Sequence, residues 1–363
     1  MQITEIEANW FELPVKIKIG AMPKFKITGT LLKLKINEGI EGVAAGHFVN
    51  SDEACAIFIR RWKKLILKRD PYDIEAITQD LINYTYRILI GNPIGISLVN
   101  CALWDIIGKS LGKPVHQVMG TYQRKVKAYA SMPYWMKPEE TVKMTQTALD
   151  ERNFKAIKIR LGQGLDKDKA VIKALTDNFS PTELEVMVDV NSGYDLKTTL
   201  KLARILESHD HFKWLEEPVF SDEIDNLAEL RSQVDISIAG GENNFGIHEF
   251  QTLLQKGAYD IIQPDATRSG GISIVKKIAS LAEANGKLCI PHVFGTGLVQ
   301  AANLQVIGSL SNCPYFEFGF YPDFILFSKD GSYKLDSDGN VKIPDGPGLS
   351  FNLDEEEISK YIK

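Results

Sequence analysis

The sequence predicts an α/β protein in which an α+β unit precedes a (β/α)8-type barrel. Two observations lead to this prediction. Strand patterns come before helix patterns up to about residue 120, and from Val126 short apolar strands alternate with helix-length segments. Repeated βα units form a parallel sheet, and eight of them close into a barrel. The length of 363 residues fits a chain of two domains.

The N-terminal part has the pattern of strands followed by helices. The stretches "ITEIEANWFEL" and "GTLLKLKINEGIEGVAAG" show β alternation, which Gly and Asn interrupt as turn residues do. From Ser51, which can cap a helix, apolar residues recur at near-helical spacing. Residues 97–120 predict another helix, and Gly112 and Pro114 mark its end. This order of elements is typical of an α+β unit.

Eight short apolar segments follow, each separated from the next by a helix-length stretch. They are "VKAYAS", "KAIKIR", "LEVMVDVN", "FKWLEEP", "ISIAGGE", "YDIIQPD", "KLCIPH" and "YFEFG". We therefore assign residues 1–125 to an N-terminal α+β domain, 126–325 to the barrel and 326–363 to a C-terminal segment. That segment has a Pro/Gly linker and a short acidic helix, and we expect it to pack on the first domain and complete it.

The composition excludes several classes of protein. The net charge is −5 and no basic block stands out, so nothing favours nucleic-acid binding. The chain has neither a signal-peptide pattern nor an apolar run of about 18 residues, so we expect no membrane span. A P-loop is also absent, which argues against a nucleotide enzyme. The cysteines form no CxxC pair, which predicts reduced core thiols in a cytoplasmic protein: Cys55, Cys101, Cys289 and Cys313.

Each predicted strand ends in a polar residue, and the spacing of these residues matches that of βα units. The series is Ser131, Lys158, Asp189, Glu216, Glu242, Asp265, His292 and Glu317. Successive members are 23 to 31 residues apart. A barrel of roughly 250 residues has about 31 per βα unit, so each step is one compact unit. We therefore expect these side chains to meet at one rim of the barrel, where barrel active sites lie.

Three successive members of this series are carboxylates. The stretch "FKWLEEPVF" places Glu216 within an apolar run, where an unpaired charge costs several kcal/mol. Asp189, Glu216 and Glu242 can share a site only around a cation, and oxygen ligands favour Mg²⁺. Strand alternation places Glu217 on the opposite side, so we expect it to have a structural role, hydrogen-bonded behind the site.

The remaining members of the series predict a base and an anion-binding site. Asp265 beside His292 can fix the imidazole tautomer and raise its basicity, which suits a general base or acid. Lys158 and Arg160 are two residues apart, so both should point into the barrel. Two cations there suit a small-molecule carboxylate substrate, whose carboxylate Lys158 would hold, or a buried salt bridge to the acids. The expected substrate contacts are Lys158, Asn191, His47 and Tyr134, with Tyr129, Trp135, Tyr321 and Asp323 as further candidates.

Together these motifs resemble the enolase superfamily and, within it, the mandelate racemase subgroup. The likeness covers almost the whole chain: "ALWDIIGKSLGKPVHQVMG", "KIR", "VDVN", "WLEEP", "GGEN", "QPD", "PH", "FEF" and "PDGPGL". It implies that the first domain caps the barrel and that loops around residues 21–24 and 47–50 set specificity. It also implies Mg²⁺ at Asp189, Glu216 and Glu242, an Asp265–His292 pair, and Glu317 as a hydrogen-bond donor to the substrate carboxylate.

The chemistry implied by this resemblance is removal of a proton α to a carboxylate. The resulting enediolate would be stabilised by the divalent cation, by Lys158 and by a protonated Glu317. One departure bears on the reaction: the subgroup commonly has a second Lys where this chain has Arg160. Arginine stays protonated and is a poor base, so we expect one-sided chemistry with His292 as the base.

The one-sided reaction that we favour is dehydration of an aldonic or aldaric acid to a 2-keto-3-deoxy acid. His292 could act in both steps, or Arg160 or a bound water could assist. A racemase or epimerase of the same fold and a non-catalytic barrel are the alternatives. Dipeptide epimerases and muconate cycloisomerases fit less well, because "QPDATRSGG" has Asp265 where they carry a Lys. We also expect a homo-oligomer.

Overall fold

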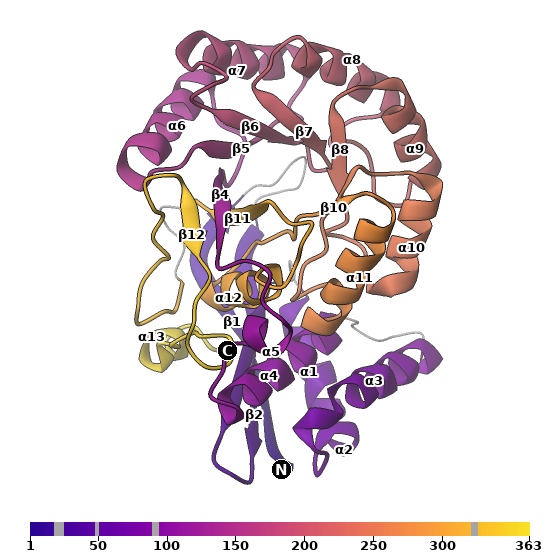
Figure 1. The fold of residues 1–363 in the computed structure, drawn as a ribbon, viewed down its shortest axis with the longest axis vertical. Helices are drawn as coiled ribbons and strands as arrows, with labels where there is room; N and C mark the ends of the chain where they lie inside the picture. The colour runs from indigo at the N-terminus through magenta and orange to yellow at the C-terminus, as the bar shows by residue number, and fades with distance from the viewer. Residues whose placement is uncertain (18–24, 48–50, 89–93, 321–325) are drawn as a thin grey trace.

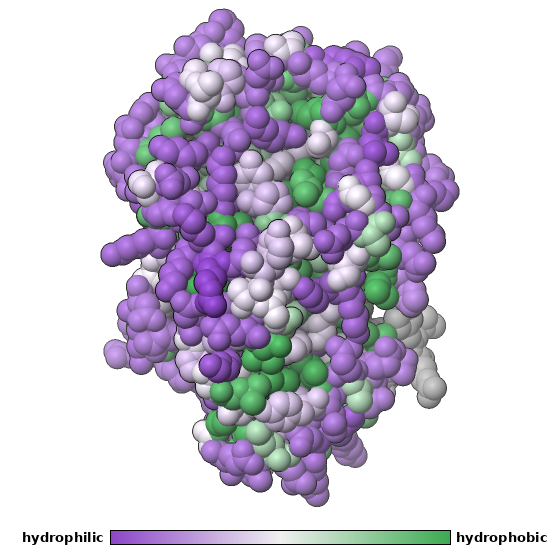
Figure 2. Space-filling view, viewed as in Figure 1, coloured by the Kyte–Doolittle hydropathy of each residue, from purple (hydrophilic) through white to green (hydrophobic). Residues whose placement is uncertain are grey.

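The computed structural model describes residues 1–17, 25–47, 51–88, 94–320 and 326–363. Figure 1 shows a barrel of strands and surrounding helices, with the N-terminal elements gathered below it and the C-terminus beside them. On the face in Figure 2 the surface is largely hydrophilic, with apolar side chains in separate patches. Among the described residues, no helix combines the length and apolar character that a membrane span requires.

The N-terminal unit is a three-stranded antiparallel sheet covered by helices. The strands β1 (Ile3–Ile17), β2 (Phe25–Ile36) and β3 (Glu41–Gly46) pair in that order. The helices are α1 (Asp52–Arg61), α2 (Lys63–Ile66), a 3-10 turn (Pro71–Asp73), α3 (Ile74–Ile88), α4 (Ile94–Ser110) and α5 (Val115–Val118). This arrangement confirms the predicted order of strands and then helices.

The helix prediction differs from the structure in two details. The stop predicted at Gly112 and Pro114 is confirmed, because α4 ends at Ser110 and Gly112 turns the chain with a φ of +62°, but the range 97–120 also contains the separate helix α5 after Pro114. The side chain of Ser51 does not cap α1. Its backbone carbonyl accepts a hydrogen bond from the Cys55 amide at 2.9 Å instead.

The barrel consists of eight parallel strands, which match the eight predicted segments. They are β4 (Lys125–Ser131), β5 (Ala156–Arg160), β6 (Glu185–Asp189), β7 (Phe212–Glu216), β8 (Ser237–Gly240), β9 (Ile261–Ile262), β10 (Leu288–Cys289) and β11 (Tyr315–Gly319). Neighbours pair from β4 to β10, and β11 pairs with β4. Between β10 and β11, the Cys289 amide donates to the Asn312 carbonyl at 3.0 Å.

A helix connects each barrel strand to the next, as Figure 1 shows. These helices are α6 (Pro138–Arg152), α7 (Leu165–Asn178), α8 (Leu196–Glu207), α9 (Ile224–Gln233), α10 (Gly246–Lys256), α11 (Ile272–Ala284) and α12 (Gly297–Ile307). The strands together with these connecting helices form the predicted (β/α)8-type fold.

The barrel interior contains its own apolar cluster, whose members mark the inward-facing positions of the strands. Its buried members are Tyr129, Ala156, Met187, Trp214, Ala239, Ile261 and Ile290, with Tyr315 packed against them. Because side chains two apart on a strand share a face, the residue two positions later lies above this cluster. On the strands the pairs are Tyr129 and Ser131, Ala156 and Lys158, Met187 and Asp189, Trp214 and Glu216, and Tyr315 and Glu317; Ile290 and His292 have the same spacing just beyond β10.

The C-terminal segment contacts both units. Its strand β12 (Asn340–Lys342) pairs antiparallel with β4 of the barrel. Its last residues, beyond helix α13 (Glu355–Ser359), return to β1, where the Lys363 amide donates to the Trp10 carbonyl at 2.9 Å. The Glu12 amide also donates to the Tyr361 carbonyl at 3.1 Å.

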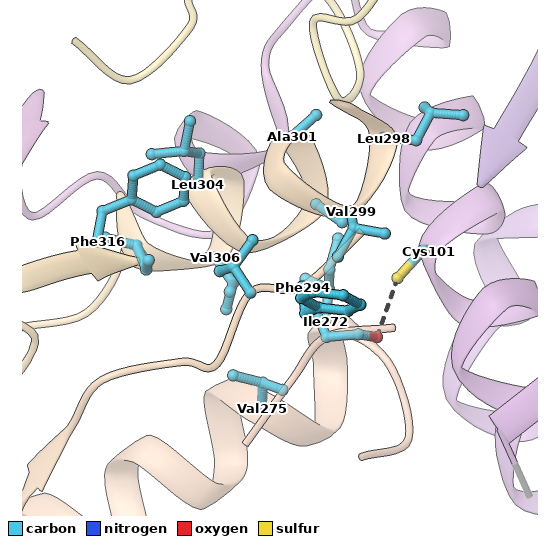
Figure 3. Close-up of a cluster of buried hydrophobic side chains, with 14 of the residues drawn as sticks. Cys101, Ile272, Val275, Phe294, Leu298, Val299, Ala301, Leu304, Val306 and Phe316 are labelled. Atoms are coloured by element: carbon cyan, nitrogen blue, oxygen red, sulfur yellow. Dashed lines mark hydrogen bonds between the residues drawn. The ribbon is translucent and has the colours of Figure 1, made fainter. Parts of the chain in front are cut away.

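One large apolar core joins the N-terminal unit to the helices outside the barrel strands. Figure 3 shows α12 side chains such as Leu298 and Val299 near Cys101 of α4. The Cys101 thiol donates to the Ala266 carbonyl at 3.2 Å. All four cysteines are buried and free, as the sequence predicts, and burial raises the pKa of the Cys55 thiol to about 12.

Candidate active site

Three carboxylates meet at the C-terminal ends of neighbouring strands. Asp189 ends β6 and Glu216 ends β7, while Glu242 follows β8. One ligand oxygen of each lies within 4.8 Å of the others. Asp189 and Glu216 are buried, and 13% of the Glu242 side chain is exposed. Such an all-oxygen set on rigid strands fits a hard divalent cation such as Mg²⁺.

Glu242 reaches this group although it breaks the two-residue periodicity. Ala239 belongs to the interior cluster, so alternation would point Gly241 inward instead. Gly241 has a φ of +129°, and a Cβ there would lie 2.8 Å from the Phe250 ring. Glycine tolerates this conformation. The turn at Gly241 interrupts the alternation of side chains after β8, so that Glu242 points toward the other two carboxylates.

Lys158 and Arg160 neutralise the carboxylates and point into the barrel, as expected. The Lys158 Nζ atom lies 2.5 Å from Glu216 Oε1 and 3.6 Å from Asp189 Oδ2. The Arg160 guanidinium donates to Asp189 and also to Asn191 Oδ1 at 3.1 Å. Lys158 has no exposed surface, so its charge is balanced by the surrounding acids.

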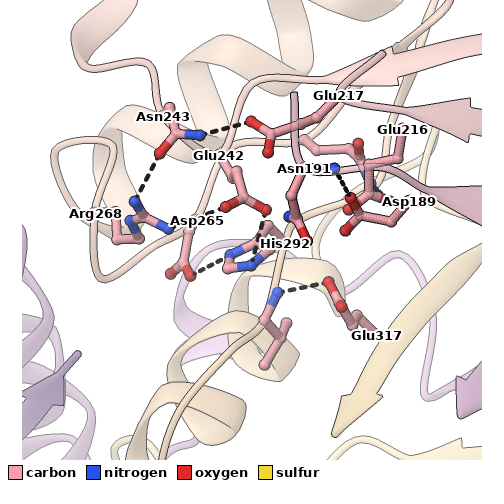
Figure 4. A network of polar contacts seen from close by, with 12 residues as sticks. Asp189, Asn191, Glu216, Glu217, Glu242, Asn243, Asp265, Arg268, His292 and Glu317 are labelled. Carbon is pink, nitrogen blue, oxygen red and sulfur yellow. Dashed lines mark hydrogen bonds and ion pairs between the residues drawn. The ribbon is translucent and has the colours of Figure 1, made fainter. Parts of the chain in front are cut away.

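Asp265 and His292 form the predicted pair. Nδ1 of His292 lies 3.0 Å from Asp265 Oδ2, and because a carboxylate only accepts, Nδ1 is the protonated nitrogen. Thr267 and Asn303 donate to the other oxygen of Asp265 and fix its position. Figure 4 shows His292 between Asp265 and Glu242, with Nε2 3.1 Å from Glu242 Oε2.

The charges around His292 keep its basicity high. Burial alone would lower the pKa of the imidazole, but the Glu242 carboxylate and the hydrogen bond to Asp265 outweigh burial and raise it above the ordinary value. The imidazole therefore lies between two carboxylates, with Nδ1 toward Asp265 and Nε2 toward Glu242 at the edge of the cavity. This is the geometry of a general base.

Glu317 lies at the end of β11 and is held from three sides. Lys158 Nζ lies 2.7 Å from its Oε1, Ser131 Oγ donates to the same oxygen at 2.7 Å, and the Val293 amide donates to Oε2 at 3.0 Å. Burial raises the pKa of this carboxyl, but Lys158 and His292 outweigh burial and lower it. The expected protonated Glu317 is therefore not what this arrangement favours, because a buried cation lies beside it.

A cavity of about 350 Å³, a size typical of small-molecule sites, opens beside Arg160, Glu242 and His292. It is lined by His47, Arg160, Asn191, Ser192, Glu217, Phe220, Ser221, Glu242, Asn243, Arg268, His292 and Phe294. Asn191 and His47, both predicted as substrate contacts, are thus placed at the cavity. The loop residues 21–24 and 48–50, and the candidates Tyr321 and Asp323, lie outside the described residues.

The expected position of Glu217 is wrong. Strand β7 ends at Glu216, and Glu217 has a φ of +44°, so strand alternation does not extend to it. Its side chain lines the cavity and accepts a hydrogen bond from Asn243 Nδ2 at 2.6 Å. Burial, with the nearby charge of Glu242, raises the pKa of this carboxyl to about 8.

The structure does not bring Tyr134 to the cavity. Strand β4 ends at Ser131, and Tyr134 lies outside the lining residues with 43% of its surface exposed. Tyr129 belongs to the cluster inside the barrel, and Trp135 has the Lys167 ammonium 5.9 Å from its ring centre. These three aromatic residues belong to β4 or follow it, but their side chains do not line the cavity.

Arg268 and Asn243 also line the cavity, although no sequence pattern indicated them. The Arg268 guanidinium donates to Asn243 Oδ1 at 2.9 Å and lies 3.4 Å from Glu242 Oε1. Both follow predicted site residues closely, Asn243 in "GGEN" and Arg268 in "QPDATRSGG". Counting one polar residue per strand end overlooks such loop residues, because each loop contributes several side chains to the rim.

The chain matches two models of known protein families. Residues 1–120 match the model "Mandelate racemase / muconate lactonizing enzyme, N-terminal domain", and residues 140–357 match "Enolase C-terminal domain-like". The chain belongs to the enolase superfamily. Within it, the two models and the relatives below place the chain in the mandelate racemase subgroup.

Several relatives of this enolase-superfamily chain have named activities. Arabinonate dehydratase from Saccharolobus solfataricus is 30% identical over 91% of this chain and 89% of its own. D-galactarolactone cycloisomerase from Agrobacterium fabrum is 28% identical over 99% of both chains. A crystal structure of an enolase-superfamily member from Polaromonas sp. JS666 superposes with a TM-score of 0.92, at 26% identity over 99% and 97% of the two chains.

Proposed function

We propose that the chain is a Mg²⁺-dependent enzyme that removes the proton α to a carboxylate of an acid sugar. The observation that supports this most directly is the juxtaposition of three acids with an oriented histidine, where Glu242 and His292 line the cavity and the other two acids lie next to Glu242. Asp189, Glu216 and Glu242 would hold the ion, which when bound neutralises the acids and makes the α C–H bond more acidic. The relatives named as sugar-acid dehydratases favour a carbon–oxygen lyase.

Proton removal, charge stabilisation and substrate orientation would each be carried out by different residues of the chain. Nδ1 of His292 faces Asp265, and Nε2 lies 3.1 Å from Glu242 at the cavity; with Glu242 engaged as an ion ligand, Nε2 would be the nitrogen that takes the α-proton. Lys158 lies between Glu216 and Glu317, where its ammonium can stabilise the negative charge that develops on the substrate carboxylate. Arg160 and Asn191 line the same cavity and can orient the substrate by hydrogen bonds.

Dehydration fits the one-sided arrangement better than racemisation. A racemase needs a proton acceptor on each face of the α-carbon, and Arg160 stays protonated. After proton removal the 3-hydroxyl leaves, and the 2-keto-3-deoxy acid forms. His292, once protonated, can return its proton to the leaving hydroxyl when both groups depart from the same side.

A screen of acid sugars tests this proposal. We expect Mg²⁺ and the enzyme to convert at least one aldonic or aldaric acid into a keto product, which semicarbazide detects by absorbance and NMR identifies. Exchange of the α-proton with solvent deuterium and interconversion of stereoisomers, without keto product, would instead indicate a racemase or epimerase. Neither product nor exchange on the full panel would contradict the proposed chemistry.

The variant His292→Asn is the control for the screen. Asparagine keeps a donor toward Asp265 but removes the base, so turnover should fall by about 100- to 10,000-fold. Binding of Mg²⁺, measured by calorimetry, should remain, because His292 is outside the ligand set. Turnover equal to that of the parent would remove the role assigned to His292.

Cycloisomerisation of a sugar lactone is a second candidate. It is favoured by the relative named D-galactarolactone cycloisomerase, because the match to that relative covers 99% of each chain. That reaction would use the same proton removal, followed by departure of a ring oxygen rather than of water. Including galactarolactone in the screen and following its product by NMR distinguishes the two.

A further inference from the structure

His47 is the only described cavity-lining residue that comes from the N-terminal unit. It directly follows β3, which ends at Gly46, and its surface is 7% exposed. The imidazole also packs near the ring of Phe294, with 5.1 Å between the ring centres. The capping sheet therefore contributes one imidazole at a fixed place beside the catalytic rim.

The hydrogen-bond partner of His47 fixes the tautomer of its ring. Nδ1 of His47 faces the backbone carbonyl of Thr28, and a carbonyl oxygen only accepts, so Nδ1 carries the proton. Thr28 is itself held, because its hydroxyl donates to the buried carboxylate of Asp52 at 2.5 Å. The same carboxylate accepts from Thr30 at 3.1 Å. This chain of contacts leaves the imidazole little freedom to rotate.

The other ring nitrogen, Nε2, has a lone pair and no hydrogen. Burial, assisted by the positive charges of Arg268 and His292, lowers the pKa of His47 to about 4, so the ring is neutral near pH 7. Within the described part of the chain, Nε2 is enclosed and has no hydrogen-bond partner. A buried acceptor without a partner is unfavourable, so its position predicts a ligand that donates to it.

We propose that Nε2 of His47 accepts a hydrogen bond from a hydroxyl of the bound acid sugar, and so selects substrates with a donor at that position. The inference rests on the proposed function for the class of ligand. The acceptor role of His47 differs from the role of the cavity arginines, because Arg160 and Arg268 only donate hydrogen bonds and therefore bind oxygen acceptors. A carboxylate or ether oxygen facing His47 would place lone pair against lone pair and would be rejected.

The tautomer is tested on the protein alone. In full-length protein with ¹⁵N-labelled histidine, the imidazole whose signals disappear in His47→Asn should be neutral from pH 6 to 9, with Nδ1 protonated and Nε2 bare. An imidazole with hydrogen on Nε2 in this range would overturn the proposal. At least one acid of the screening panel, added with Mg²⁺, should shift the Nε2 resonance, and no shift with any of them would also overturn it.

The selectivity is tested with the acid that the enzyme turns over best. Replacing each of its hydroxyls in turn by hydrogen, fluorine or methoxy should reveal one position where all three changes lower kcat/KM by about 10- to 100-fold. In His47→Asn, which keeps a donor toward Thr28, this discrimination should fall to within about threefold. Discrimination unchanged in the variant, or absent in the parent, would show that Nε2 faces only water or protein.

A control variant and a second readout distinguish the role of His47 from a general effect of histidine loss and from the dehydratase assignment. The variant His248→Asn alters an exposed histidine on α10 and should keep the full discrimination. If the screen shows racemisation or cycloisomerisation instead of dehydration, the same analogue series is scored on that reaction. A loss of the dehydratase assignment with a retained hydroxyl preference would then contradict the proposed function and support the role of His47.

Discussion

At the scale of single residues, the site depends on a lysine that has no contact with solvent. Lys158 Nζ lies within 2.5 to 3.6 Å of carboxylate oxygens from Glu216, Glu317 and Asp189. Removing charges from water costs several kcal/mol per ion, and only close pairing offsets that cost. The lysine thus allows three acids to be buried together in the folded chain.

Replacing this lysine should lower the stability of the metal-free protein more than that of the Mg²⁺-bound protein. Lys158→Met leaves buried acids without their cation, so we expect the free energy of unfolding without Mg²⁺ to fall by about 3–5 kcal/mol. Urea denaturation measures this loss. Added Mg²⁺ should stabilise the variant more than the parent, because the ion replaces the missing positive charge.

The matched control is Lys173→Met on α7. Lys173 pairs with Asp177 at 2.7 Å, and 76% of its side chain is exposed. Exposed pairs contribute at most about 1 kcal/mol, so this variant should change stability little. Equal losses for the two variants would show that Lys158 is not needed to balance the buried acids.

At the scale of elements, helix α4 joins the capping sheet to the C-terminal segment. Asp105 in α4 accepts from the Val43 amide of β3 at 2.9 Å and from the Leu349 amide at 2.8 Å. Gly348 has a φ of +68°, and a Cβ there would lie 2.1 Å from Asp105 Oδ1. The tail therefore needs glycine at this point to approach the buried carboxylate.

Removing that carboxylate should loosen the tail. Asp105→Ala leaves two buried amides without acceptors, at about 1–3 kcal/mol each, so we expect a loss of roughly 2–5 kcal/mol in unfolding free energy. Hydrogen exchange at the Val43 and Leu349 amides should become faster. The control Asp80→Ala removes an exposed partner of Arg69 and should cost less than about 1 kcal/mol. Unchanged exchange at both amides would contradict the linking role of Asp105.

At the scale of the whole molecule, the proposed metal ligands come from three consecutive βα units. Asp189, Glu216 and Glu242 can lie within 4.8 Å of one another only when β6, β7 and β8 are in register. An unfolded chain does not hold the three acids together. Binding of the ion is therefore linked to folding of the barrel.

Removal of Mg²⁺ should lower the thermal stability reversibly. At an ion concentration of 100 times Kd, binding to the folded state alone adds about 2.7 kcal/mol, and a chelator should cancel that gain. Calorimetric Tm values measured across a Mg²⁺ titration check this. The gain should disappear in Glu242→Gln and persist in Glu229→Gln, an exposed residue of α9. A parent Tm that does not respond to Mg²⁺ would contradict the proposed metal site.

Much of the arrangement could be predicted from the sequence because strand alternation and βα spacing are local properties. The eight barrel strands appear where the apolar segments predict them, and Lys158, Asp189, Glu216, His292 and Glu317 share one rim. Two of the predictions that failed concern side chains that follow strand ends. Glu217 and Tyr134 follow the last paired residue of β7 and β4, where the two-residue period no longer holds.

The sequence by itself determined the order of elements, the family, and the residues that can meet at the barrel rim, because these follow from periodicity and chemical type. Only the tertiary structure decided which loop residues enter the cavity and what state the side chains favour there. Arg268 reaches Glu242, Lys158 favours an ionised Glu317, and Thr28 fixes the ring of His47. Each of these contacts joins residues distant in the chain, so its geometry and electrostatics exist only after folding.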